Sequence, residues 1–252
     1  MTPIKRSRGP GRSIPERTLA STNRSTSAVS GNIVQVAGIS SEAEARMLVE
    51  CGVDFLGFPL ALDVHDEEIS RQDAGRIIRS LLPPHFGVVI TYLDTARDVI
   101  ALCDALGAGL VQLHGRVAPE ELSRIKRARP FLRIIKSIVV RREAEPDFAT
   151  SIDDIAHAVD AFIIDTFDPA TGASGATGQT HDWRVSRRIV ERSPRPVILA
   201  GGLTPENVAD AIGIVRPAGV DAHTGVEDTA GRKDRQRVGN FVQRARHAFG
   251  RV

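Results

Sequence analysis

From about residue 33, short apolar runs alternate with amphipathic stretches along the chain. The runs are nearly all apolar, which is typical of parallel strands buried on both faces. We expect strands at residues 33–39, 53–60, 87–92, 110–113, 132–139, 161–164, 197–200 and 219–222. This repeated β-then-α order predicts a single closed (β/α)₈ TIM barrel of the α/β class. No Gly-x-Gly-x-x-Gly fingerprint opens an early helix, so a nucleotide-binding open sheet is the weaker interpretation.

Helix-start signals fall between these runs. Ser41 and Glu44 form a potential capping box, and Thr95 is suited to an N-cap. Thr204 is suited to a further N-cap, and Pro119 and Pro205 to first-turn positions. We therefore expect helices to follow the strands throughout.

Chain length and composition support one domain with a basic leader. The 252 residues match the usual size of one α/β barrel, and 42% hydrophobic content provides a core without disulfides or metals. Residues 1–31 carry Lys5, Arg6, Arg8, Arg12, Arg17 and Arg24 against a single acid, Glu16. This Ser/Thr/Pro/Gly-rich leader has no aromatic residue and cannot bury much apolar area. We expect residues 1–31 to be a flexible tail and residues 32–252 to be the barrel.

The remaining composition favours a cytoplasmic enzyme. The only cysteines, Cys51 and Cys103, indicate neither a disulfide framework nor a thiolate zinc site. No apolar run is long enough for secretion or membrane insertion. We expect no membrane partner, no nucleic-acid partner and no cofactor, and the sequence does not specify an oligomeric state.

Two glycine-containing turns carry the strongest chemical signal. Gly201 and Gly202 follow the seventh predicted strand, and Thr224 and Gly225 follow the eighth. Loops at these two places of a barrel gather main-chain N–H groups around a phosphate. A further glycine-rich segment, residues 165–183, includes Gly178 and is expected to lie over the catalytic face. A phosphorylated small molecule is the predicted ligand.

Five segments then show a specific resemblance, in order and with matching spacing. They are residues 111–115 (VQLHG), 162–166 (FIIDT), 175–183 (GATGQTHDW), 197–208 (VILAGGLTPENV) and 219–227 (GVDAHTGVE). Together they resemble phosphoribosylanthranilate isomerase from about residue 33 to the C-terminus. The resemblance implies a TIM barrel that converts an aminoaldose phosphate into an aminoketose phosphate in tryptophan biosynthesis, by an Amadori rearrangement.

That reaction needs an acid at the furanose ring oxygen and a base for the C2 proton of the resulting Schiff base. The family's acid corresponds to Asp165. Its base is the cysteine of a Lys-Ile-Cys-Gly-Ile type motif, where residues 34–39 here read VQVAGI. Ala37 therefore stands where the family has the thiol. Residues 62–68 (LDVHDEE) likewise contain no Arg to match the family's carboxylate-binding Arg.

Three histidines follow predicted strands and converge on one rim of the barrel: His65, His114 and His223. His114 belongs to the family motif and is, with the other two, a candidate catalytic residue. We expect His65 or His223 to replace the thiolate, with a purely binding role as the alternative, and Asp63 and Asp221 to orient their rings. A divalent-metal site built from Asp63, His65, His114, Asp165 and His223 is a weaker hypothesis, because no compact ligand motif supports it.

Three functions are consistent with these residues. The first is an isomerase of the kind just named, with Asp165 as acid and a substitute base. The second is a barrel enzyme of altered chemistry, such as a lyase or metal-assisted isomerase, acting on another phosphorylated substrate. The third is a non-catalytic protein that binds a phosphorylated metabolite. The presence of Asp165 and His114 favours the two enzymatic functions, because a protein that only binds a metabolite needs no acid.

Overall fold

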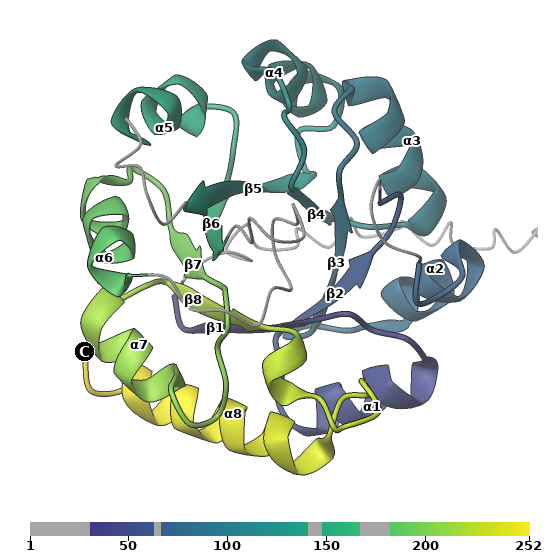
Figure 1. The fold of residues 1–252 in the computed structure, drawn as a ribbon. Coiled ribbons are helices and arrows are strands. Elements are labelled where there is room, and N and C mark those ends of the chain that lie inside the picture. Colours follow the sequence, from purple (N-terminus) through teal and green to yellow (C-terminus); the bar gives the residue numbers. More distant parts are fainter. Residues whose placement is uncertain (1–30, 63–66, 141–147, 167–181) are drawn as a thin grey trace, which may run out of the picture.

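Eight parallel strands form a closed barrel in chain order, each paired with its neighbours and β1 with β8. The computed structural model describes residues 31–62, 67–140, 148–166 and 182–252 (Figure 1). The strands are β1 (Ile33–Ala37), β2 (Phe55–Pro59), β3 (Phe86–Thr91), β4 (Leu110–Leu113), β5 (Arg133–Val140), β6 (Ala161–Thr166), β7 (Val197–Leu199) and β8 (Gly219–Ala222). The predicted barrel and all eight predicted strands are confirmed, with end points shifted by at most two residues.

Helices surround the strands as an outer ring (Figure 1). They are α1 (Glu42–Glu50), α2 (Arg71–Ser80), α3 (Ala96–Leu106), α4 (Pro119–Ala128), α5 (Phe148–Ala156), α6 (Trp183–Arg192), α7 (Val208–Val215) and α8 (Arg235–Phe249), with a 3₁₀ helix η1 (Thr224–Val226) after β8. Thr95 caps α3 by accepting a hydrogen bond from the Asp98 N–H, and Pro119 is the first residue of α4, as predicted.

Two of the predicted helix starts differ in detail from the structure. Ser41 accepts from the Glu44 N–H as expected, but the Glu44 carboxylate accepts from the Ser40 N–H, one residue before the cap. Helix α7 begins at Val208 with Asn207 as its N-cap. Thr204 and Pro205 lie in the turn that leads into α7, where the Thr204 hydroxyl accepts from the Glu206 N–H at 3.1 Å and the Thr204 carbonyl accepts from the Val208 N–H at 3.1 Å, as a capping residue does.

Two apolar layers hold the barrel together. The outer layer lies between strands and helices and includes Val34, Val36, Leu113 and Phe162. The inner layer fills the barrel and includes Ile33, Ala37, Ile135 and Ile163. Alternate residues of each strand enter alternate layers, because side chains in a strand point to opposite faces. Polar residues at inward positions therefore lie inside the barrel.

Carboxylates fasten the strand starts. Asp54, just before β2, accepts from the Val34 N–H at 2.7 Å and from Arg246 of α8 at 2.7 Å. Asp160, just before β6, accepts from the Ile134 N–H at 2.8 Å and pairs with Lys126 and Arg133. Each carboxylate thus joins one strand to the preceding strand at the end of the barrel associated with stability.

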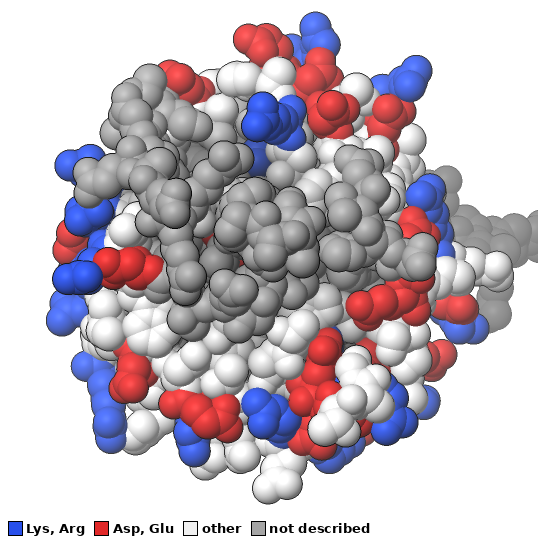
Figure 2. Space-filling model, viewed as in Figure 1, with Lys and Arg blue, Asp and Glu red and all other residues white. Residues whose placement is uncertain are grey.

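The outer surface carries mixed charge. In Figure 2, Lys and Arg side chains alternate with Asp and Glu around the periphery of the visible face. Among the described residues, no helix is long and apolar enough to cross a membrane.

We expect that deleting residues 1–31 leaves folding intact. β1 begins at Ile33 and pairs with both β2 and β8, so the described strands close the barrel between themselves. The truncated and full-length proteins should unfold cooperatively at temperatures within a few degrees of each other, as measured by calorimetry. Loss of the cooperative transition on truncation would contradict the division of the chain at residue 31.

Candidate functional site

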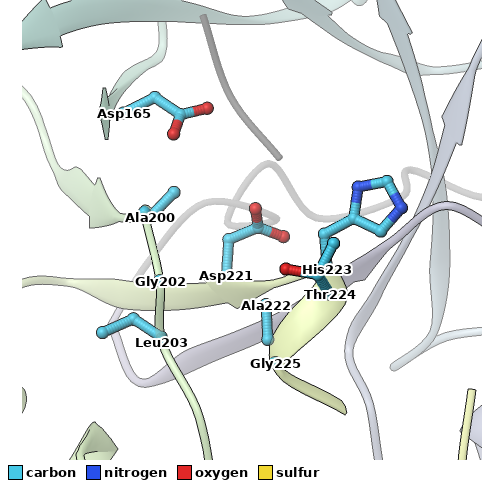
Figure 3. A pocket seen from close by; sticks show the side chains of 10 residues that line it. Asp165, Ala200, Gly202, Leu203, Asp221, Ala222, His223, Thr224 and Gly225 are labelled. Atoms are coloured by element: carbon cyan, nitrogen blue, oxygen red, sulfur yellow. The ribbon is translucent and has the colours of Figure 1, made fainter. Parts of the chain in front are cut away.

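A pocket opens beside the carboxyl ends of β6, β7 and β8 (Figure 3). Its lining comes from the end of β6, the turn after β7, the end of β8 and η1: Asp165, Ala200, Gly201, Gly202, Leu203, Asp221, Ala222, His223, Thr224 and Gly225. Seven of these were predicted from the sequence as site residues. The carboxyl ends of parallel strands are where barrels place their active sites.

The turn after β7 depends on two consecutive glycines in left-handed backbone conformations. Gly201 has φ of 94° and Gly202 has φ of 61°, which side chains with a Cβ adopt rarely. Asn207 holds the turn from behind: its Nδ2 donates to the Gly202 carbonyl at 3.0 Å, and its Oδ1 accepts from the Thr204 N–H at 2.8 Å. The main chain is thereby presented to the pocket in one conformation.

Gly225 allows the β8 side of the pocket to pack directly on this turn. A Cβ at Gly225 would lie 1.9 Å from the Leu203 carbonyl oxygen, so only glycine fits. Arg237 of α8 donates to the Gly225 carbonyl from outside the pocket, at 2.9 Å from Nη2. Gly202 and Gly225 both line the pocket, which brings the main chains of the two turns together in the arrangement that binds an anion.

Two buried carboxylates, Asp165 and Asp221, line the same pocket. Asp165 is 5% exposed and Asp221 is 8% exposed. Burial raises the pKa of Asp221 to about 7, and the nearby Asp165 charge acts in the same direction. A hydrogen bond from Gln35 and the positive charge of Lys233 oppose this rise in pKa. Near neutral pH, Asp221 is therefore able to hold and to release a proton.

His223 lies on the side of the pocket toward β1 and β2 (Figure 3). Its Nε2 is 3.5 Å from a Glu227 carboxylate oxygen and 3.7 Å from one of Glu68. A Cβ at Gly38 would meet this nitrogen at 2.2 Å, so the ring lies directly against the Gly38 main chain. Glu227 also pairs with Lys233, whose side chain is 1% exposed. The carboxylates that face the His223 ring are thus Glu227 and Glu68, whereas the sequence analysis expected Asp221.

His114 lies apart from this pocket, after β4. Its Nε2 is 2.7 Å from Gln112 Nε2, and its ring contacts Tyr92 with centroids 5.7 Å apart. Burial and the charge of Lys136 lower the pKa of His114 to about 3, so the ring is neutral at pH 7. Gln112 Oε1 in turn accepts from Gln35 Nε2 at 2.8 Å. This line of amides crosses the barrel interior from His114 toward Asp221.

Three polar residues of the barrel were missed by the sequence analysis. Gln35 and Gln112 interrupt otherwise apolar strand runs, and this interruption was the available signal, because a buried amide needs a partner. Lys136 of β5 is 9% exposed, and its Nζ donates to the Ser137 carbonyl at 3.0 Å. Burial lowers the pKa of Lys136 to about 8.

Three predicted site residues, Asp63, His65 and Gly178, lie outside the described residues. Among the residues that are described, no group of three His, Cys, Asp or Glu side chains is arranged to hold a metal ion.

Comparison with known protein families gives one consistent result. Residues 34–244 match the model of the N-(5'-phosphoribosyl)anthranilate (PRA) isomerase family. N-(5'-phosphoribosyl)anthranilate isomerase 2 of Methanosarcina mazei is 39% identical over 220 residues, which cover 87% of this chain and 96% of the relative. The isomerase of Methanothrix thermoacetophila is 37% identical over 213 residues, covering 84% and 97% respectively.

Solved structures agree with this result. Phosphoribosyl anthranilate isomerase from Thermotoga maritima superposes with a TM-score of 0.72 at 31% identity, covering 85% of this chain and 98% of that chain. A phosphoribosyl anthranilate isomerase in complex with reduced 1-(O-carboxyphenylamino)-1-deoxyribulose 5-phosphate gives a TM-score of 0.70 at 29% identity, with the same coverage.

Proposed function

Because this chain belongs to the N-(5'-phosphoribosyl)anthranilate isomerase family, we propose that it catalyses the Amadori rearrangement of phosphoribosylanthranilate in tryptophan biosynthesis. The observation that carries this proposal is the pocket, which combines two buried carboxylates with two glycine turns. A phosphorylated sugar needs both features: an anion site to hold it and groups that move protons at its reacting end.

The phosphate is held by the Gly201–Gly202 turn and by Thr224 and Gly225. All four residues line the pocket, and glycine at three of the four positions lets the main chain approach the anion. Direct contact between Gly225 and the Leu203 carbonyl keeps the two turns at one corner. Binding energy at this corner orients the sugar for reaction at its other end.

Asp165 is the acid that protonates the furanose ring oxygen. It stands at the end of β6 with its side chain directed into the pocket (Figure 3). When the proton arrives, the bond between C1 and the ring oxygen breaks and the nitrogen lone pair forms a protonated Schiff base. A second group must then remove the C2 proton to give an enolamine, which ketonises by gaining a proton at C1 and losing the hydroxyl proton at C2.

The sequence-based hypothesis assigns that second proton transfer to His65 or His223, and it stays a prediction. His223 lines the pocket beside Gly38, the residue that follows Ala37. His65 lies outside the described residues. His114, the third histidine predicted as a catalytic residue, is neutral and lies after β4, apart from the pocket.

The test is complementation of a tryptophan auxotroph that lacks the isomerase, together with assay of the purified protein on phosphoribosylanthranilate. Growth and turnover are the expected results. A folded protein that supports neither growth nor turnover would contradict the proposal. It would favour instead the altered-chemistry enzyme, a lyase or metal-assisted isomerase on another phosphorylated substrate.

A further inference from the structure

A buried carboxylate stands beside the place where the thiol of the family is missing. β1 and β8 pair with Gln35 opposite Asp221 and Val36 opposite Ala222, so Ala37 is the next residue of β1 toward the pocket mouth. Ala37 belongs to the inner layer of the barrel, and Asp221 lines the pocket. Both side chains therefore point inward from adjoining strands.

One oxygen of this carboxylate is unsatisfied. Asp221 Oδ1 is buried and has no hydrogen-bond partner among the described residues. A buried polar atom without a partner costs stability, and such atoms in native proteins call for a specific explanation. The orientation of Asp221 toward Asp165 across the pocket supplies one, because a reacting substrate would lie between the two (Figure 3).

The charge of the residues around Asp221 also differs from that of the family motif. Gln35 stands where that motif has lysine, so position 35 gives Asp221 a neutral hydrogen-bond donor in place of a positive charge. Burial together with the Asp165 charge raises the pKa of Asp221 to about 7. A general base works best when its pKa lies near the operating pH. Position 37 thus has no thiol, while the adjoining strand carries a carboxylate whose pKa suits a general base.

We propose that Asp221 is the general base that removes the C2 proton, in place of the absent thiolate at position 37. Asp221 Oδ1 takes the proton as the C2–H bond breaks and the C1=C2 double bond forms, and the resulting carboxylic acid returns a proton to C1. The Asp165 carboxylate receives the proton of the C2 hydroxyl during ketonisation, so both residues end as they began. This assignment rests on the proposed isomerase function.

His223 is less well placed for this step. Its Nε2 already faces Glu227 and Glu68, and its ring packs against Gly38 at the edge of the pocket. Its side chain is 19% exposed, whereas Oδ1 of Asp221 is buried and has no competing hydrogen-bond partner in the described part of the chain.

The experiment follows loss of deuterium from C2 of phosphoribosylanthranilate labelled at that position. We expect Asp221→Asn to slow the loss by roughly 10² to 10⁴, the usual effect of removing a positioned base. The matched control Asp210→Asn, on the exposed side of α7, should leave the rate unchanged. If Asp221→Asn releases deuterium at the wild-type rate, or if His223→Gln alone abolishes release, the inference is wrong.

A second readout needs no turnover. Because the folded pKa of Asp221 is raised, the native wild-type protein retains a proton that the unfolded chain loses, and wild-type stability falls as the pH rises from about 4 to about 7. Asn does not titrate, so Asp221→Asn should unfold several degrees above the wild type at pH 8 and near it at pH 4. A variant that is inactive and less stable at pH 8 would indicate a merely structural role and overturn the inference.

The wild-type enzyme separates this inference from the proposed function. If the wild type releases no deuterium, the isomerase proposal fails, whereas the stability comparison still reports on the buried proton. If the wild type is active, kcat/KM should fall as the pH drops below about 7, because protonated Asp221 cannot accept a proton. An active enzyme whose kcat/KM is flat from pH 5 to 8 would contradict the assignment.

Discussion

Replacing Asp165 with Asn should reduce kcat by roughly 10² to 10⁴, the usual contribution of one positioned proton donor. Asn keeps the size of the side chain but has no proton of suitable acidity for the furanose ring oxygen. The phosphate corner is built from the turn after β7 and from η1, so KM should change little. Steady-state kinetics on phosphoribosylanthranilate measures both parameters.

The matched control is Asp153→Asn, which makes the same chemical change at an exposed position of α5. It should retain the wild-type kcat. If Asp165→Asn remains within tenfold of the wild type, another group delivers the proton. In that case the resemblance to the family does not extend to the role of this residue.

Replacing Gly202 with Asp should abolish phosphate binding. At one hundred times its Kd, inorganic phosphate stabilises a protein by about 2.7 kcal/mol, which raises the Tm of a domain of this size by roughly 5–10 °C. The variant should show no such rise, because its carboxylate lies beside the anion and repels it. The fold should survive, since Gly202 has φ of 61° and Asp is among the residues that tolerate this conformation.

Gly239→Asp is the control for this measurement. Gly239 lies on α8 with no atom within 4 Å of an added Cβ, and it is outside the pocket. Its Tm should rise with phosphate as in the wild type. If Gly202→Asp also retains the full rise, the phosphate binds elsewhere and the assignment of the two glycine turns is wrong.

The local sequence pattern determines the positions of the strands and of the turns that follow them. Segments 110–113 (LVQL) and 219–222 (GVDA) were predicted with their exact bounds as strands β4 and β8, because short, mostly apolar runs are typical of strands buried on both faces. The turns between the runs carry glycines with positive φ, such as Gly201 and Gly202. Such turns can also be predicted from the local sequence, because glycine adopts this conformation readily. The sequence also identified Asp165 as a site residue, because it comes directly after the apolar residues of β6 within a motif that resembles the family.

Contacts between side chains on different strands, and the pKa values that depend on them, were decided only by the tertiary structure. The hydrogen bond from Gln35 to Gln112 joins residues 77 positions apart, and no local pattern records such a pairing. The carboxylates facing His223 come from Glu227 and Glu68, on segments that meet only when β8 closes against β1. The proton affinity of Asp221 likewise depends on burial and on the charge of Asp165, both created by closing the barrel. Strand formation depends on each segment's own side chains, whereas pKa and hydrogen-bond partners depend on neighbours that the chain brings together only on folding.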